Sequence, residues 1–194
     1  GNPIADSFWN DTNLSWDIYY YYITAQDLAG NQSVGSDTVT GIPVDLQSCV
    51  MLRIADQGGT SDTVWFGTKA GASDDIDTLY GEIELPPPVI DVCDARWRIP
   101  STNGTWLDIR DTLGEGQTSK TFVLDIQSGL SGYPMTVRWS SASLPSGDFL
   151  LLDEQTHGSL IRVNMKAESL LVLSNQTITS LEILHTFAAT MVMH

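Results

Sequence analysis

Basic side chains are scarce in this chain, which has 9 Lys and Arg against 24 Asp and Glu. None precedes Arg53, and the formal net charge is −15. A surface that holds nucleic-acid or lipid phosphates needs clustered Lys and Arg. We therefore expect neither nucleic acid nor an anionic membrane surface as a partner.

Long apolar runs are also missing, since no stretch approaches the roughly 18 apolar residues that cross a bilayer. We expect no membrane insertion. The N-terminal GNPIADSFW has no Met and no charged-then-apolar signal peptide, so we interpret the chain as a mature or excised piece of a longer protein. A length of 194 residues allows one large domain or one and a half.

Catalytic patterns are absent as well, and we expect no enzymatic activity. The segment 129–133, GLSGY, lacks the second Gly of a nucleophile elbow. The three histidines, His157, His185 and His194, are too isolated for a readable triad or zinc site, and His157 beside Gly158 is predicted to be an exposed turn residue. Asp153-Glu154 and the acids of the loop at 74–94 could pair as glycosidase carboxylates, but only at a separation that sequence does not reveal.

Alternating polarity is the dominant pattern and predicts β-strands. Phe122, Leu124 and Ile126 fall on one face of a strand, and Met135, Val137 and Trp139 repeat the pattern. Breaks rich in Gly, Pro, Ser and Asp separate such runs, which indicates an all-β, antiparallel sandwich of immunoglobulin/fibronectin-like or jelly-roll-like type.

The last part of the chain, residues 159–194, contains no Gly or Pro. A helix through Met165–Leu173 is one interpretation. We favour short strands, because β-branched residues are frequent here. The tail 186–194 alternates at Phe187, Ala189, Met191 and Met193, so it is either a last strand or an engineered or misread end.

The first forty-three residues carry an aromatic run, Tyr19–Tyr20–Tyr21–Tyr22–Ile23, followed by TAQDLAGNQS. This pattern closely resembles the C-terminal half of a bacterial fibronectin type III domain. In strand geometry Tyr19, Tyr21 and Ile23 share a face, and Gly30–Asn31 supplies a turn. The family's Leu-x-Pro-Gly segment is replaced by Leu14-Ser15-Trp16, a departure at the corner before the tyrosines.

A few strands of this kind do not form a stable sandwich alone. We therefore expect residues 1–43 to pack on the domain that follows or to be completed by strands from another chain. The strand-pairing segment would be Tyr19–Ile23. The partners would be copies of this chain or neighbouring domains of the same protein.

A second resemblance covers about residues 46–184. Its motifs are FGTKAGASDDID at 66–77, GEIELPPP at 81–88, DARW at 94–97, Gly-Tyr-Pro at 132–134 and LPSG at 144–147. They look like a module common in large secreted bacterial proteins, including type IX secretion cargo. The resemblance implies an extracellular, non-catalytic β-sandwich at 44–194, with Asp75 where the family usually has Gly.

The acidic segment 70–95 contains seven carboxylates and no Lys or Arg. Asp74, Asp75 and Asp77 are candidate oxygen ligands for a structural calcium ion, the one cofactor considered. The alternative, which we favour, is a solvated loop whose aspartates bond to their own backbone.

Cys49 and Cys93 are the only cysteines. A disulfide between them would close a loop of about 44 residues and stabilise the fold by about 3 to 4 kcal/mol. Two buried thiols fit the sequence nearly as well, because neither neighbourhood resembles a metal or redox motif.

Six tryptophans are many for this length. Trp97, Trp106 and Trp139 could form a sugar-stacking platform, which would make polysaccharide a partner. We favour core packing for them, and for Trp65 beside Phe66, because they lie within alternating runs.

The sequence thus predicts a secreted or cell-surface protein with a structural or adhesive role that assembles with copies of itself through strand edges into a fibre. The alternative is a carbohydrate-binding accessory module of a secreted hydrolase.

Overall fold

The structure is a computed structural model that describes residues 19–41, 49–112 and 118–186. The chain divides into two units, residues 1–44 and 45–194, and each is described by itself. The tail at 187–194, for which a last strand was one of the alternatives, lies outside the described residues. No helix of the described part is long and apolar enough to cross a membrane.

The first unit contains a two-stranded antiparallel sheet. Its strands are β1 (Tyr19–Tyr21) and β2 (Val39–Gly41). Tyr19 lies opposite Gly41 and Tyr21 opposite Val39, so the residues between the two strands form a long hairpin.

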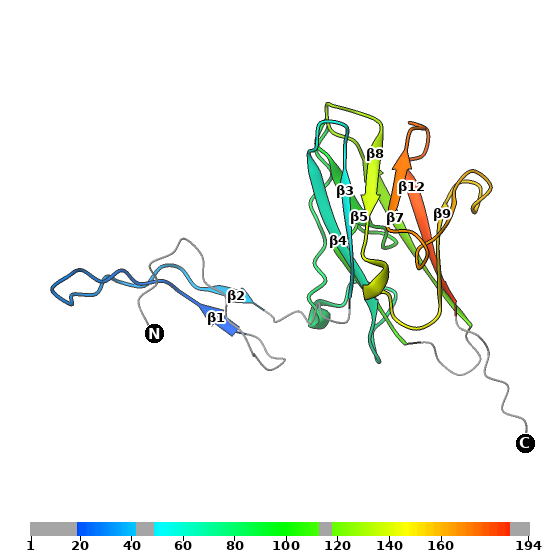
Figure 1. The fold of residues 1–194 in the computed structure, drawn as a ribbon. Coiled ribbons are helices and arrows are strands. Elements are labelled where there is room, and N and C mark those ends of the chain that lie inside the picture. The colour runs from blue at the N-terminus through cyan, green and yellow to red at the C-terminus, as the bar shows by residue number, and fades with distance from the viewer. Residues whose placement is uncertain (1–18, 42–48, 113–117, 187–194) are drawn as a thin grey trace, which may run out of the picture. The chain divides into compact units, whose positions relative to one another are not determined.

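The second unit is a sandwich of two five-stranded sheets, which confirms the predicted all-β class (Figure 1). One sheet has the order β11 (Leu170–Leu173), β8 (Met135–Arg138), β3 (Val50–Ala55), β4 (Ser61–Thr68), β6 (Leu107–Arg110). The other has the order β10 (Arg162–Asn164), β9 (Asp148–Asp153), β12 (Ser180–Thr186), β7 (Ser119–Gln127), β5 (Asp94–Trp97).

The core lies between the two sheets and follows the alternation in the sequence. On β7 the side chains of Phe122, Leu124 and Ile126 are buried, and on β8 those of Met135 and Val137 are fully buried. Burying each such side chain contributes about 1.5 to 3 kcal/mol, so one face of every central strand fixes its register.

The sandwich departs from a purely antiparallel arrangement at one pair, because β4 and β6 run parallel. The chain leaves this sheet after β4, passes through β5 in the opposite sheet, and returns along β6 in the same direction. A crossover of this kind is the usual requirement for a parallel pair.

The described residues contain no α-helix, and the only helical turns are the 3₁₀ segments η2 (Thr78–Tyr80) and η3 (Ser141–Ser143). Between Met165 and Leu173, where a helix was one interpretation of the sequence, the chain forms a turn followed by β11. The β-branched composition was the better guide there.

Candidate functional site

The hairpin of the first unit holds the tyrosine-rich segment, and it is the best candidate for an interaction surface. Beyond β1 and β2 its two arms stay paired through serines. The amide of Ile23 donates to Ser36 Oγ and that of Ala25 to Ser33 Oγ, while the amides of Ser33 and Ser36 donate to carbonyls on the opposite arm.

The hairpin tip is organised by one carboxylate. Asp27 accepts hydrogen bonds from the amides of Ala29 and Asn31 and from the Asn31 side chain, all between 2.8 and 2.9 Å. These bonds lower the pKa of Asp27. Gly30 has a φ of 90°, a left-handed conformation that glycine adopts without steric cost. The turn predicted at Gly30–Asn31 is therefore present.

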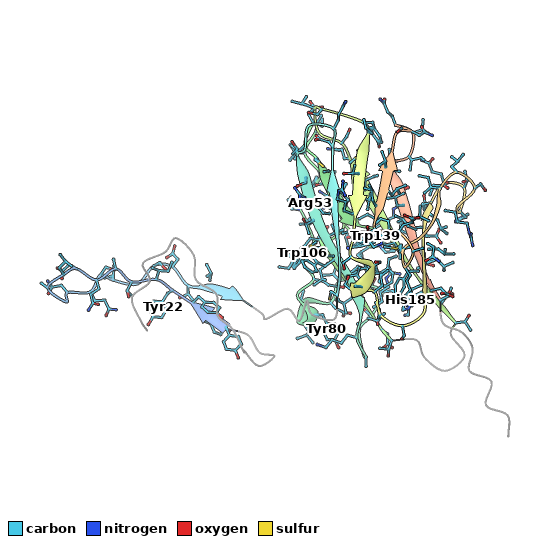
Figure 2. The ribbon with its side chains drawn as sticks, in the orientation of Figure 1. Tyr22, Arg53, Tyr80, Trp106, Trp139 and His185 are labelled. Carbon is cyan, nitrogen blue, oxygen red and sulfur yellow. The ribbon has the colours of Figure 1, made fainter. Side chains whose placement is uncertain are left out.

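The two faces of the hairpin expose large apolar side chains. Tyr20 is 68% exposed, Tyr22 is 64% exposed and Ile23 is 76% exposed, and Val39 on the facing strand is similarly open. Tyr19 and Tyr21 stack on each other with ring centroids 6.4 Å apart. Tyr22 lies on the hairpin (Figure 2), where its ring packs against Gly35. Within the described residues, no third strand joins this sheet.

Such a ribbon is marginal in water on its own, since a hairpin needs a third strand or a packing surface for independent stability. Its exposed aromatic and β-branched side chains favour pairing with a further strand or apolar surface.

The predicted calcium ligands are held in a different way. Asp77 accepts a hydrogen bond from the amide of Ser73, and Asp74 lies 3.8 Å from Lys120 with its carboxylate largely exposed. Asp75 is exposed and its amide donates to Ser73 Oγ. Among the residues that the structure describes, no group of three or more His, Cys, Asp or Glu is placed to hold a metal ion. Asp77 therefore bonds to the nearby backbone, as the alternative interpretation expects. Calcium binding stays a prediction.

A different carboxylate organises this acidic segment. Glu82 is fully buried, and its Oε2 accepts the amide of Asp77 at 2.6 Å while Oε1 accepts the amide of Ile109 on β6. Burial raises the pKa of Glu82 to about 7, helped by the nearby charges of Asp108 and Asp77, whereas the two amide bonds oppose the shift. The side chain thus fastens the acidic segment to the edge of the sandwich.

A disulfide between Cys49 and Cys93, one of the two alternatives from the sequence, is wrong for this fold. Both cysteines are buried, and they are not joined. Cys93 Sγ lies 3.9 Å from the carbonyl of Ile54 near the end of β3, whereas Cys49 precedes the start of that strand. Five residues of strand between Cys49 and Ile54 span about 16 Å, far beyond disulfide reach.

The tryptophan platform is also wrong, because two of its three members belong to the core. Trp97 is fully buried beside Phe66 and Phe122, with ring centroids 5.4 and 6.0 Å away. Trp139 is buried and its Nε1 donates to the carbonyl of Met165 at 2.8 Å. Trp106 is half-buried and lies apart from Trp139 in the sandwich (Figure 2).

Trp65 was predicted to lie in the core, and it does not. Its neighbours on β4, Val64 and Phe66, are buried between the sheets, so Trp65 points to the outer face and is half-buried. It lies opposite Met51 of β3 on that face.

The predicted turn residue His157 is exposed, with a left-handed φ of 49°. It lies in the loop between β9 and β10, which is organised by the buried carboxylate of Asp153. Asp153 accepts bonds from the amides of Thr156, Leu160 and Ile161 and from the Thr156 hydroxyl. Burial alone would raise the pKa of Asp153, but these donors hold it well below its usual value. Asp153 and Glu154 are thus bonded to structural partners, Glu154 to Arg98 and Ser180.

Comparisons with protein-family models, with curated proteins and with solved structures found no match. The two family resemblances in the sequence therefore stay predictions.

Proposed function

We propose that this chain is a non-catalytic structural or adhesive protein of a bacterial cell surface that assembles with copies of itself through its strand edges. The observation that carries the proposal is the exposed hairpin, in which Tyr20 lies on β1 and Tyr22 and Ile23 follow it on the same arm. The extracellular location is supported by the resemblance of residues 46–184 to modules of secreted bacterial proteins.

The composition of the hairpin supports pairing between chains. Residues 19–26, YYYYITAQ, contain no charge, proline or glycine. Short segments with high β-propensity and no charge pair readily with other strands. Natural edge strands that must stay unpaired usually carry Lys or Pro instead.

The test is the mass of the full-length chain in solution, measured by light scattering over a dilution series. We expect the wild type to form concentration-dependent oligomers and a Tyr20→Ser, Tyr22→Ser double variant to remain monomeric. Leu79→Ser and Leu130→Ser serve as controls, because both side chains are exposed on the other unit.

The controls should associate as the wild type does. A wild type that stays monomeric throughout the series would contradict the proposal. So would equal loss of association in the control variants, since association would then depend on exposed apolar surface of any kind.

A further inference from the structure

Strand addition needs an open sheet edge on the receiving molecule. The described part of the sandwich has four edge strands: β5, β6, β10 and β11. Each edge can be judged by where its outward main-chain groups are bonded, since a row of unbonded N–H and C=O groups is what a new strand pairs with. The four edges differ sharply in this respect.

The β5 edge is closed. The amide of Arg98 donates to Val123 on β7, so the alternation of the ladder turns Ala95 and Trp97 outward. Ala95 donates its amide to Asp62 Oδ2 at 2.9 Å. Trp97 exchanges two main-chain bonds with Thr105, at 2.8 and 3.1 Å. Three of the four outward groups of these two residues are therefore bonded.

The amides on the β6 edge are blocked by side chains. The carbonyls of Trp106 and Arg110 face β4, which turns the amides of Leu107 and Ile109 outward. Leu107 donates to Thr105 Oγ1 at 3.3 Å, and Ile109 donates to the buried carboxylate of Glu82. A strand approaching β6 would have to displace both acceptors.

The β10 edge is short and partly folded over. It has three residues, and Arg162 at its start is exposed. At its end the carbonyl of Asn164 accepts the amides of Ala167 and Glu168, at 3.1 and 3.0 Å. A short edge with a charged residue is the usual protection against unwanted pairing.

The β11 edge is open. The amide of Trp139 donates to Ser169, so by alternation Leu171 and Leu173 face β8 while the main chains of Leu170 and Val172 face away. Nothing in the described part of the chain bonds to those outward groups of Leu170 and Val172. The strand has no charge, proline or glycine, and Val172 is 52% exposed.

Two arginines lie beside this edge on the outer face of the sheet. Arg53 of β3 is directly opposite Arg138 of β8, and Arg138 is directly opposite Leu170 of β11. Figure 2 places Arg53 on the sandwich unit. Arg53 bonds to Ser61, and within the described residues neither arginine pairs with a carboxylate, in contrast to the arginines at 96, 98 and 110.

Two like charges directly opposite each other destabilise a sheet. An acidic neighbour would compensate their repulsion. The hairpin fits, because residues 19–41 contain Asp27 and Asp37 and no Lys or Arg. Residues 19–26 of the hairpin are uncharged, as β11 is, so they can contact β11 while the two aspartates lie outside that contact.

We propose that β11 is the acceptor edge for assembly, and that its occupant is the hairpin arm containing Tyr19–Ile23 from a second copy of this chain. This inference rests on the proposed function and adds the receiving surface to it. Donor and acceptor are different surfaces, so each copy can receive the hairpin of one neighbour at β11 and donate its own hairpin to another neighbour. Such a heterologous contact builds a filament or a ring.

The first experiment measures association of full-length variants at the acceptor edge. Val172→Lys places a charge beside the outward main chain of β11, and Val172→Thr is the matched β-branched control. We expect Val172→Lys to weaken association at least about tenfold, corresponding to the loss of one or two hydrogen bonds, and Val172→Thr to leave it unchanged. Thermal melting verifies that both variants fold.

The second experiment locates the contact. A Gln26→Cys chain, altered at an exposed position of the same arm, and a Leu170→Cys chain are mixed and treated with a bifunctional maleimide. The wild type, whose own cysteines are buried, serves as background. We expect a crosslinked pair containing one chain of each kind, and Val172→Lys added to the Leu170→Cys chain should abolish it.

The outcomes separate the two proposals. Association that survives Val172→Lys but is lost in the Tyr20, Tyr22 double variant overturns the β11 assignment and leaves assembly through the hairpin intact. Absence of the crosslinked pair in a mixture that associates also overturns it. A monomeric wild type refutes both.

Discussion

The side chain of Glu82 accepts a hydrogen bond from the main-chain amide of Ile109, so a buried carboxylate occupies the outer edge of β6. The same carboxyl group accepts the amide of Asp77. One residue thereby anchors the acidic segment and blocks an outward amide of a sheet edge from pairing.

The pH dependence of stability tests this role of Glu82. Its pKa is about 7 in the folded chain against an ordinary 4.5, so between these values the folded state binds more protons than the unfolded state. Glu82 should therefore raise the free energy of unfolding below about pH 4.5. This contribution should be lost as the pH rises through 7.

The measurement is urea unfolding of the wild type and of Glu82→Gln across this range. Gln cannot titrate, so the unfolding free energy of the wild type minus that of Glu82→Gln should fall as the pH rises. Glu168→Gln, at an exposed position, should show no such trend. A difference between wild type and Glu82→Gln that does not vary with pH would refute the shifted pKa.

A second prediction concerns Asp153, whose carboxylate accepts four hydrogen bonds in the loop after β9. Asp153→Asn replaces one acceptor oxygen with a donor group, so at least one loop amide loses its partner. We expect a loss of about 2 kcal/mol in unfolding free energy at neutral pH.

Because the pKa of Asp153 is lowered, its contribution is present at neutral pH and is lost as the pH falls. The deficit of Asp153→Asn should therefore shrink in acid. Asp148→Asn, at the exposed start of the same strand, is the control. Equal stability of both variants at neutral pH would show that the loop does not depend on this carboxylate.

A third prediction concerns the core tryptophan. Trp97→Ala removes a fully buried ring beside Phe66 and Phe122, and we expect it to cost about 3 to 5 kcal/mol. Trp106→Ala should cost clearly less, because that ring is half-buried. Chemical denaturation monitored by circular dichroism gives both values, and the reverse order would contradict the assignment of Trp97 to the core.

A fourth prediction concerns the cysteines. After unfolding without reductant, two thiols per chain should react with a chromogenic disulfide reagent, because Cys49 and Cys93 lie toward opposite ends of β3. Reductant should leave the melting temperature unchanged. Absence of reactive thiols would mean that the two residues come together in a different arrangement.

The sequence predicts the fold through local alternation. Phe122, Leu124 and Ile126 repeat with the period of a strand, and burial of the face they share fixes the register of that strand. The same rule, applied strictly, would have placed Trp65 outside, because its neighbours Val64 and Phe66 occupy the inner positions. Hydrophobicity alone was the wrong guide at that residue.

The site was less predictable, because its determinants are contacts between distant segments. Glu82 meets Ile109 from a loop 27 residues earlier, and in sequence it resembles any solvated acid. The pairing of Arg53 with Arg138 depends on the order of strands in the sheet, which alternation does not encode. The tyrosine run, by contrast, was readable because local composition alone marks it.

Hydrogen exchange of the intact wild-type chain at increasing concentration tests assembly through the hairpin most directly. We predict that amide protection rises with concentration in two peptides, one containing Tyr20–Ile23 and the other Leu170–Val172. A core peptide containing Phe122 should not change. Protection that is independent of concentration in both peptides would contradict assembly between chains.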